Sequence, residues 1–363
     1  MSFLSDLLNL LFGTKPVTTP PTASAPGSSQ PVTLPDSSDE PPQICSPKVL
    51  VLIYNPTMDA GSGKKLVDTM NWSRPDDLVA AFISEILQCS NGLVRYQVAQ
   101  RLELDEFPAL TDGFQYNPAS YLDVMQHGAP AHNPSGIDYA AIINRFNIQQ
   151  NVAAGVYDEV WVMGFPYAGL YESTMGGLGA FWCNGPVLAN TAGCVRRFVI
   201  MGFNYERTVG EMLHSYNHRS ESILAQVFKS LDFLSWAYKP GRSPATLNAG
   251  PALNHFQQFI LFDQIAPGKA GVGLVHYPPN GAKDYDLGNP NMVPSTCYDW
   301  LQYPGFKGDV RMVSSTEWGG GDERAYQSWW LTHLPKVAGR QNGIHNNWWQ
   351  YIANPNNVSV NPA

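Results

Sequence analysis

The sequence predicts an α/β fold: a mostly parallel sheet with flanking helices, an irregular aromatic-rich C-terminal part, and a disordered N-terminal linker in front. Short, continuous apolar runs rich in β-branched residues alternate with segments of helical periodicity, which is typical of a buried parallel sheet with crossover helices. Hydrophobic residues make up 44% of the 363-residue chain, enough for a deep core. The linker is predicted from a stretch of Pro, Ser and Thr that precedes the first strand.

Residues 1–13 form a short amphipathic stub, because their apolar side chains fall at helical spacing. The stub is too short to span a bilayer and lacks the basic start of a secretory signal. It either docks as a helix into a protein or polymer partner, lies on a membrane surface, or is a frayed terminus. Residues 14–46 cannot bury enough apolar surface to offset the entropy of ordering, so we expect a disordered tether. Residues 47–363 are then the globular body.

The body begins with the clearest strand signal, the run KVLVLIY at 48–54. The expected strands are 48–54, 93–102, 159–164 and 197–201, and the expected helices are 76–88 and 137–146. Sites in such sheets form at the carboxyl ends of the strands, where the loops 55–65, 165–184 and 202–207 leave. Periodicity fades near residue 240, which indicates a change of subdomain. Long irregular loops are expected at 275–289 and 315–324.

Composition excludes some classes of function. The net charge of −8 and the lack of clustered Lys and Arg argue against nucleic-acid binding. No transmembrane segment is predicted. Only 14% of residues are charged, a composition common in extracellular proteins and carbohydrate binders. The five cysteines form no CxxC pair, which argues against a thiolate zinc site. Cys183 and Cys194 either close a disulfide or remain buried thiols.

The segment 206–231 is the helix with the most chemical content. Glu211, His214, His218 and Glu221 fall within an arc of about 80° at ~100° per residue. Histidines at positions i and i+4 are the usual way for one helix to offer two imidazoles to one zinc ion. The same pattern also fits an ordinary solvated polar face, or a polar active site without metal.

A third metal ligand must come from elsewhere in the chain. His276 is the first choice, because it ends an apolar run and opens an irregular loop. Asp286 and Glu172 are weaker choices. The candidate catalytic bases are Glu211, Glu221 and Glu172, since a carboxylate beside the metal is needed to accept a proton from water.

Two resemblances add to this. The segment HSYNH resembles the HExxH helix of the zincin metalloproteases, with Ser215 in place of their catalytic glutamate. That resemblance implies zinc binding without ordinary zincin peptidase activity. The blocks EVWVMGFPYAGLYES, RRFVIMGFNYER, VHYPPNG and NNWWQYI resemble an uncharacterised bacterial family, often secreted or at the cell surface. This second resemblance implies an extracellular or cell-surface location, with a cytoplasmic one left open, and supplies no activity.

Two functional hypotheses follow. The first is a zinc-dependent hydrolase of unknown substrate, with His214, His218 and His276 as metal ligands. The second is a non-catalytic cell-surface or partner-binding protein tethered by its N-terminal helix. Tryptophans crowd the last third of the chain, at positions 318, 329, 330, 348 and 349. They either form a carbohydrate-binding platform, which would favour the second hypothesis, or fill the core.

Overall fold

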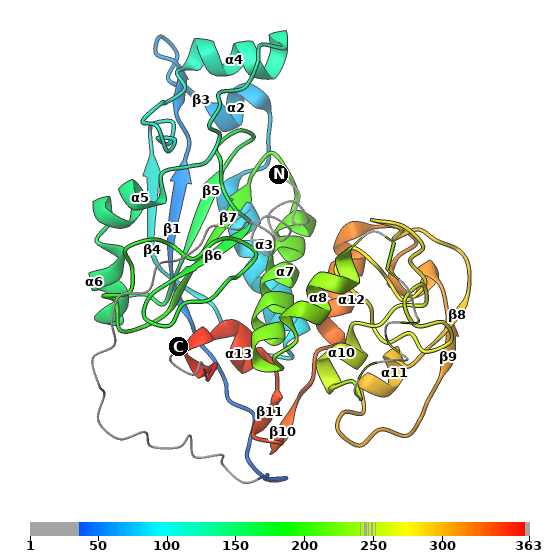
Figure 1. Cartoon of the computed structure of the whole chain (residues 1–363). Coiled ribbons are helices and arrows are strands. Elements are labelled where there is room, and N and C mark those ends of the chain that lie inside the picture. The colour runs from blue at the N-terminus through cyan, green and yellow to red at the C-terminus, as the bar shows by residue number, and fades with distance from the viewer. Residues whose placement is uncertain are drawn as a thin grey trace, which may run out of the picture.

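The computed structural model describes residues 36–359 except 240, 243, 244, 246, 248, 249 and 251. The chain forms a sheet with helices on both faces and a second, less regular lobe beside it (Figure 1). The stub predicted at 1–13 and most of the predicted linker lie outside the described residues. The described part of the chain therefore begins at Asp36, within the predicted linker.

A five-stranded sheet forms the centre of the larger half, in the order β4-β1-β5-β7-β6. Its strands are β4 (Gln97–Leu104), β1 (Lys48–Tyr54), β5 (Glu159–Gly164), β7 (Phe198–Asn204) and β6 (Ser173–Gly176). The first four run parallel to one another, and β6 pairs antiparallel with β7. The prediction of a mostly parallel sheet is confirmed.

The strand predictions succeed where burial on both faces leaves a continuous apolar run. The predicted bounds of β1 and β5 agree with the structure, and every residue of β5 is buried. The second predicted strand is displaced, because β4 begins at Gln97 and lies at the exposed edge. Edge strand β6 was predicted as part of the loop 165–184. Its four residues STMG carry too little β-branched content to announce a strand.

Helices pack on both faces of the sheet (Figure 1). On one face, Phe82 of α3 (Pro75–Cys89) contacts Trp161 of β5, Phe203 of β7 and Tyr216 of α7 (Val209–Val227). The other face is covered by α5 and α6. The remaining helices of this half are α2 (Leu66–Met70), α4 (Pro118–His127), α5 (Tyr139–Arg145) and α6 (Ile148–Ala153), with a hairpin of β2 (Thr57–Asp59) and β3 (Lys64–Lys65).

Helix α7 is buried along almost its whole length, since the sheet covers one side and the second lobe covers the other. Residues 209–225 are all buried except Glu211. The sequence left open that the polar side of this helix is an ordinary solvated face. That interpretation is wrong, because α12 (Glu323–His333) packs along α7 and excludes water from it.

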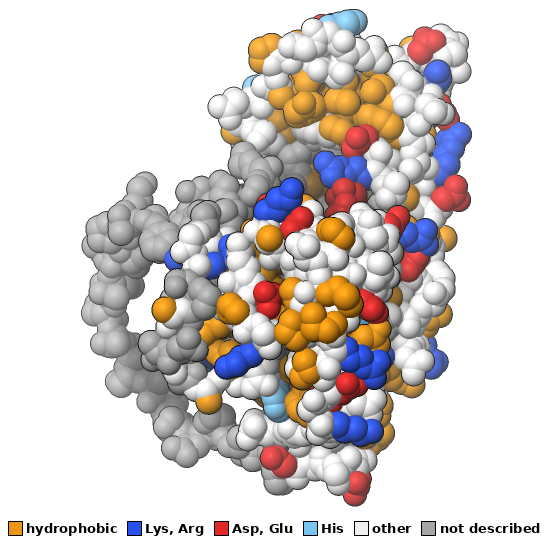
Figure 2. Space-filling model, turned by 90° about the vertical axis from the view of Figure 1, so that its right-hand side faces the viewer, with side chains coloured by type: hydrophobic (Ala, Val, Ile, Leu, Met, Phe, Trp, Pro, Cys, Tyr) orange, Lys and Arg blue, Asp and Glu red, His pale blue; other side chains and the backbone are white. Residues whose placement is uncertain are grey.

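The second lobe follows α8 (Leu231–Tyr238) and carries short elements joined by long loops. They are α10 (His255–Phe259), β8 (Val293–Ser295), α11 (Cys297–Trp300), β9 (Arg311–Val313) and η1 (Ser315–Trp318), and α12 closes the lobe. Figure 2 views the molecule from this side and shows hydrophobic side chains gathered in places between scattered charges. Trp318, Trp330, Trp348 and Trp349 are buried, so they fill the core and cannot form a surface platform.

The chain ends with the hairpin β10 (Lys336–Gln341) and β11 (Ile344–Asn347), then α13 (Trp349–Ala353) and η2 (Pro355–Asn357). Residues 36–46 lie against this region, although the sequence assigned them to the linker. Glu40 pairs with Arg340, and the Gln43 carbonyl accepts from Asn347 at 3.0 Å. The linker was predicted to end at residue 46, but part of it is already held against the body. The contacts of Glu40 and Gln43 fix this segment, although its composition alone predicts disorder.

All five cysteines are buried free thiols, so the disulfide alternative for Cys183 and Cys194 is not what the chain forms. Burial raises the pKa of Cys183 to about 11, which keeps this thiol protonated. Among the described residues, no helix has both the length and the apolar content needed to cross a membrane.

Candidate metal centre

Three histidines meet where α7, the loop after residue 274 and α12 come together. His214 and His218 project from successive turns of α7, and His276 comes from the lobe. All three are buried, and one ligand atom of each lies within 4.8 Å of the others. The predicted metal-ligand set is therefore brought together by the fold, close enough for all three to bind one metal ion.

The loop that presents His276 is fixed from three sides. The indole N–H of Trp330 donates to the carbonyl of Gly273 at 2.8 Å, and the Tyr326 hydroxyl donates to the carbonyl of Leu274. The N–H of Val275 donates to Glu221 on α7 at 3.0 Å. These bonds satisfy a buried stretch of irregular backbone, and they hold His276 in place against α7.

Each imidazole has a carboxylate at Nδ1. The distances are 2.9 Å from His214 to Glu323, 3.0 Å from His218 to Glu221 and 2.9 Å from His276 to Asp284. A carboxylate accepts a hydrogen bond, so this arrangement favours the tautomer with the proton on Nδ1 and a lone pair on Nε2. Metal-binding histidines are oriented in this way in proteins.

The Nε2 atoms of His218 and His276 lie 2.9 Å apart. With both protons on Nδ1, two lone pairs face each other at that distance and repel. A cation held by both nitrogens removes the repulsion. The alternative is a proton between the two Nε2 atoms, carried either by an imidazolium ring or by a tautomer in which His218 Nδ1 accepts from a protonated Glu221, whose pKa burial raises to about 8.

Burial and the neighbouring imidazoles set the charge of the cluster. Burial, together with the charges of His214 and His276, lowers the pKa of His218 well below its usual range. Burial also lowers the pKa of His276, although the hydrogen bond that the ring donates to Asp284 acts in the opposite direction. Both rings are therefore neutral near pH 7, the state in which imidazole coordinates a metal.

His214 differs from the other two. Burial lowers its pKa, but the hydrogen bond to Glu323 and the charges of Glu172, Glu323 and Glu211 outweigh that effect and leave the pKa raised. The acidic surroundings thus attract positive charge to the ring that lies nearest the surface carboxylates. A metal ion would meet the same attraction.

Glu221 is the most buried carboxyl group of the site. It accepts from the Tyr238 hydroxyl at 2.8 Å and from the Val275 N–H at 3.0 Å, beside its contact with His218. Burial raises the pKa of Glu221 to about 8, because the carboxylate loses its solvation there. Enclosed on all sides, Glu221 is placed to orient His218 and has no route to a substrate.

The other two candidate bases differ in where they point. Glu211 accepts from Arg207 Nη1 at 2.8 Å, and burial raises its pKa. Glu172 precedes β6, and its Oε1 lies 3.9 Å from Nε2 of His214. Asn184 donates to the other oxygen of Glu172, and the side chain is 39% exposed. Glu172 is therefore the candidate base that lies beside Nε2 of His214 and is also open to solvent.

Tyr285 covers the cluster from the outside. Its ring lies 4.0 Å from the His276 ring, and its hydroxyl lies 3.5 Å from Nε2 of His214. The residue is 49% exposed and has a φ of +56°, a left-handed conformation that strains a bulky side chain. Burial and the charges of four nearby carboxylates raise the pKa of Tyr285, so in the metal-free site its hydroxyl is protonated.

Sequence reasoning missed Asp284, Glu323, Tyr238 and Tyr285. Asp284 and Glu323 lie in the two loops predicted as irregular, 275–289 and 315–324, but nothing local shows which histidine each carboxylate meets. The weaker ligand candidate Asp286 is not near the cluster. It accepts from the Ala282 N–H at 3.0 Å and from Asn289 at 2.9 Å, and so shapes the loop.

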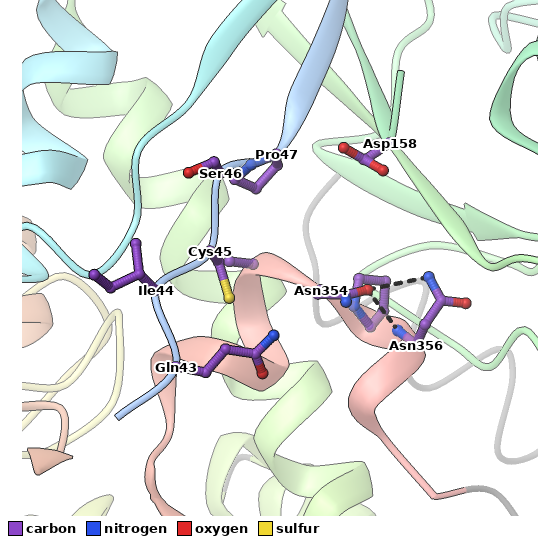
Figure 3. Close-up of a pocket in the computed structure, with 10 residues that line it drawn as sticks. Gln43, Ile44, Cys45, Ser46, Pro47, Asp158, Asn354 and Asn356 are labelled. Carbon is purple, nitrogen blue, oxygen red and sulfur yellow. Dashed lines mark hydrogen bonds between the residues drawn. The ribbon is translucent and has the colours of Figure 1, made fainter. Parts of the chain in front are cut away.

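A separate pocket lies where residues 43–47 pass the end of α13 (Figure 3). Its one carboxylate, Asp158, accepts from the Lys48 N–H at 2.8 Å and from Arg196 at 2.6 Å. Asn354 and Asn356 bond to each other across it. These groups are used in holding the chain together, so the histidine cluster remains the candidate site.

Comparisons with protein-family models, with curated proteins and with solved structures find no match to this chain.

Proposed function

We propose that the protein is a zinc-dependent hydrolase in which His214, His218 and His276 hold the metal. The observation that carries the proposal is the set of three buried imidazoles, each with Nδ1 on its own carboxylate. Three histidines with a fourth position left for water or substrate are the usual ligands of catalytic zinc. Zinc suits these ligands because imidazole is a borderline-soft donor.

The chain's own residues would divide the work. Glu221, Asp284 and Glu323 orient the three imidazoles. Glu172 is the proton acceptor, because it lies beside Nε2 of His214 and is reached by solvent. A bound zinc ion would polarise a substrate carbonyl or phosphoryl group and lower the pKa of water. Ser215 occupies the position of the zincin glutamate, so Glu172 takes that role from a different part of the chain.

Metal analysis tests the ligand set. Protein purified without added metal and without a metal-affinity tag should contain about one equivalent of zinc, since the three histidines form one site. Changing His214, His218 or His276 to Ala should remove it. His333→Ala is the matched control, because His333 is equally buried and its Nδ1 meets only the carbonyl of Trp329, at 2.7 Å. A wild type that neither contains zinc nor takes it up from solution would end the proposal.

Activity tests the assignment of Glu172. Ester, amide and phosphoester substrates should be screened with the zinc-loaded protein. Glu172→Gln should lower kcat by about 10²–10⁴-fold, because it removes the proton acceptor and keeps the shape. Its zinc content should stay at the wild-type level. Glu211→Gln, a neighbouring carboxylate tied to Arg207, should have a much smaller effect. Equal rates for Glu172→Gln and wild type would remove Glu172 from the mechanism.

A further inference from the structure

The fourth position of the site has two oxygen atoms near it. Tyr285 Oη lies 3.5 Å from Nε2 of His214, and Glu172 Oε1 lies 3.9 Å from the same nitrogen. In a tetrahedral zinc site with ligands at about 2.0–2.1 Å, neighbouring ligand atoms are about 3.3 Å apart. Measured from His214, the phenol oxygen therefore lies at about the ligand-to-ligand distance, and the carboxylate oxygen lies just beyond it.

The placement of Tyr285 is specific. Its ring stacks with the His214 ring at 10° and lies 4.0 Å from the His276 ring. Its backbone N–H donates to the His276 carbonyl at 3.1 Å, so the loop folds back over the imidazole that it presents. Asp284, the preceding residue, holds Nδ1 of the same imidazole. The loop thus delivers a ligand, its orienting carboxylate and a phenol to one place.

Tyr285 is exposed to solvent, unlike the three histidines that it covers. His214, His218 and His276 are at most 6% exposed, whereas Tyr285 is 49% exposed. A substrate that approaches Nε2 of His214 from solvent would therefore meet this exposed phenol.

From these contacts we propose that Tyr285 is a displaceable fourth metal ligand, which covers the metal when no substrate is bound and leaves it when substrate enters. This inference rests on the proposed metal site. When the phenol oxygen coordinates, its proton passes to solvent. When substrate or water replaces it, the phenolate takes a proton back. Glu172 then lies beside the vacated position.

The test uses Cu²⁺ as a spectroscopic probe in the full-length protein stripped of metal. A phenolate bound to Cu²⁺ gives a visible charge-transfer band, which histidine ligands alone do not give. We expect this band in the wild type and its loss in Tyr285→Phe, with one equivalent of copper bound in both. Tyr298→Phe is the control, since Tyr298 lies in the same lobe and its hydroxyl bonds to Glu317, which is not part of the histidine cluster. This control should keep the band.

A second measurement tests displacement. Acetohydroxamate, a small chelating anion, should bind the Co²⁺-loaded Tyr285→Phe variant about 10-fold more tightly than the wild type, because no phenol must leave first. A wild type that binds one copper ion without the band, or a band that survives in Tyr285→Phe, would overturn the role of Tyr285 and leave the metal site standing. A wild type that binds no metal would overturn both.

Discussion

Helix α7 carries two buried polar clusters, and they differ in how their charges are satisfied. Toward the sheet, Arg219 donates to both oxygens of Glu159 at 3.0 and 2.7 Å, and also to the carbonyl of Ile352 at 2.8 Å. Toward the lobe, a carboxylate lies at Nδ1 of each imidazole, and the Nε2 atoms of His218 and His276 lie 2.9 Å apart. Apart from Arg219 Nε, which has no hydrogen-bond partner, the first cluster pairs its charges with each other, whereas in the second one ligand atom of each histidine lies within 4.8 Å of the others.

The difference separates two roles of buried polar groups, one in holding the fold together and one in binding a ligand. A charged pair with every strong partner inside the protein contributes to a unique fold, and removing one member is costly. Imidazoles that each have a carboxylate at Nδ1 are oriented in the way that metal-binding histidines are. Burial by itself does not distinguish the two, because the three imidazoles are almost as fully excluded from solvent as Arg219 and Glu159. What distinguishes them is that the histidine cluster brings three possible metal-ligand atoms together.

The largest effect is expected at the cluster of Arg219 and Glu159. Arg219→Met should destabilise the fold by about 3–5 kcal/mol, because it leaves the Glu159 carboxylate buried without its partner. Urea denaturation measures this loss. Adding Glu159→Gln should recover part of it, and the folded fraction of each variant should bind one metal ion. A loss below about 1 kcal/mol would show that this pair is not what fixes α7 on the sheet.

His333 is a buried histidine outside both clusters, and it tests the effect of burial on stability in the absence of a metal site. Burial lowers the pKa of His333 to about 4, against an unfolded value of 6.5. Between these values the unfolded chain binds a proton that the native chain does not, so stability is complete above pH 6.5 and falls as the pH drops toward 4. The loss should reach about 3 kcal/mol.

Chemical denaturation at a series of pH values, with metal-free protein, measures this loss. His333→Gln should show a flatter dependence on pH in the same window, because glutamine does not titrate. Parallel curves for the variant and the wild type would mean that His333 is not the group responsible.

In the histidine cluster, the loss of a carboxylate should have a smaller effect, seen in zinc affinity. Glu221→Gln should weaken zinc binding by about 10–100-fold, the usual effect of losing the group that orients a metal-bound imidazole. Competition with a chromophoric chelator gives the affinity. Glu159→Gln, which changes the carboxylate of the other cluster, should leave the zinc affinity unchanged. Equal losses in the two variants would mean that the clusters act as one network.

The smallest effect concerns the N-terminal segment. Deleting residues 1–35 should change the free energy of unfolding by less than about 0.5 kcal/mol. Deleting 1–46 should cost about 1–2 kcal/mol more, since it removes Glu40 from Arg340 and the Gln43 carbonyl from Asn347. Thermal denaturation of the two truncated proteins separates them. Identical curves would return the linker boundary to residue 46.

Local patterns predicted much of the fold and half of the site. The buried strands β1 and β5 carry their signal within six or seven residues, and His214 and His218 are set by the period of one helix. His276 was chosen because an apolar run ends there. The partners that make the cluster informative could not be predicted, because Glu323 lies 109 residues from His214. The burial of α7 depends on docking of the lobe, which no single segment encodes.

The origin of the three histidines has a consequence for folding. Two of them lie on one continuous helix, whose turns form early and locally, but the third lies on an irregular loop held by Trp330 and Tyr326 of α12. The loop can be fixed only after α12, further along the chain, has reached α7. We therefore expect the cluster to be completed late in folding. Stopped-flow refolding with Co²⁺ in solution would then show the metal's colour developing with the slowest phase, after the helical signal has already recovered.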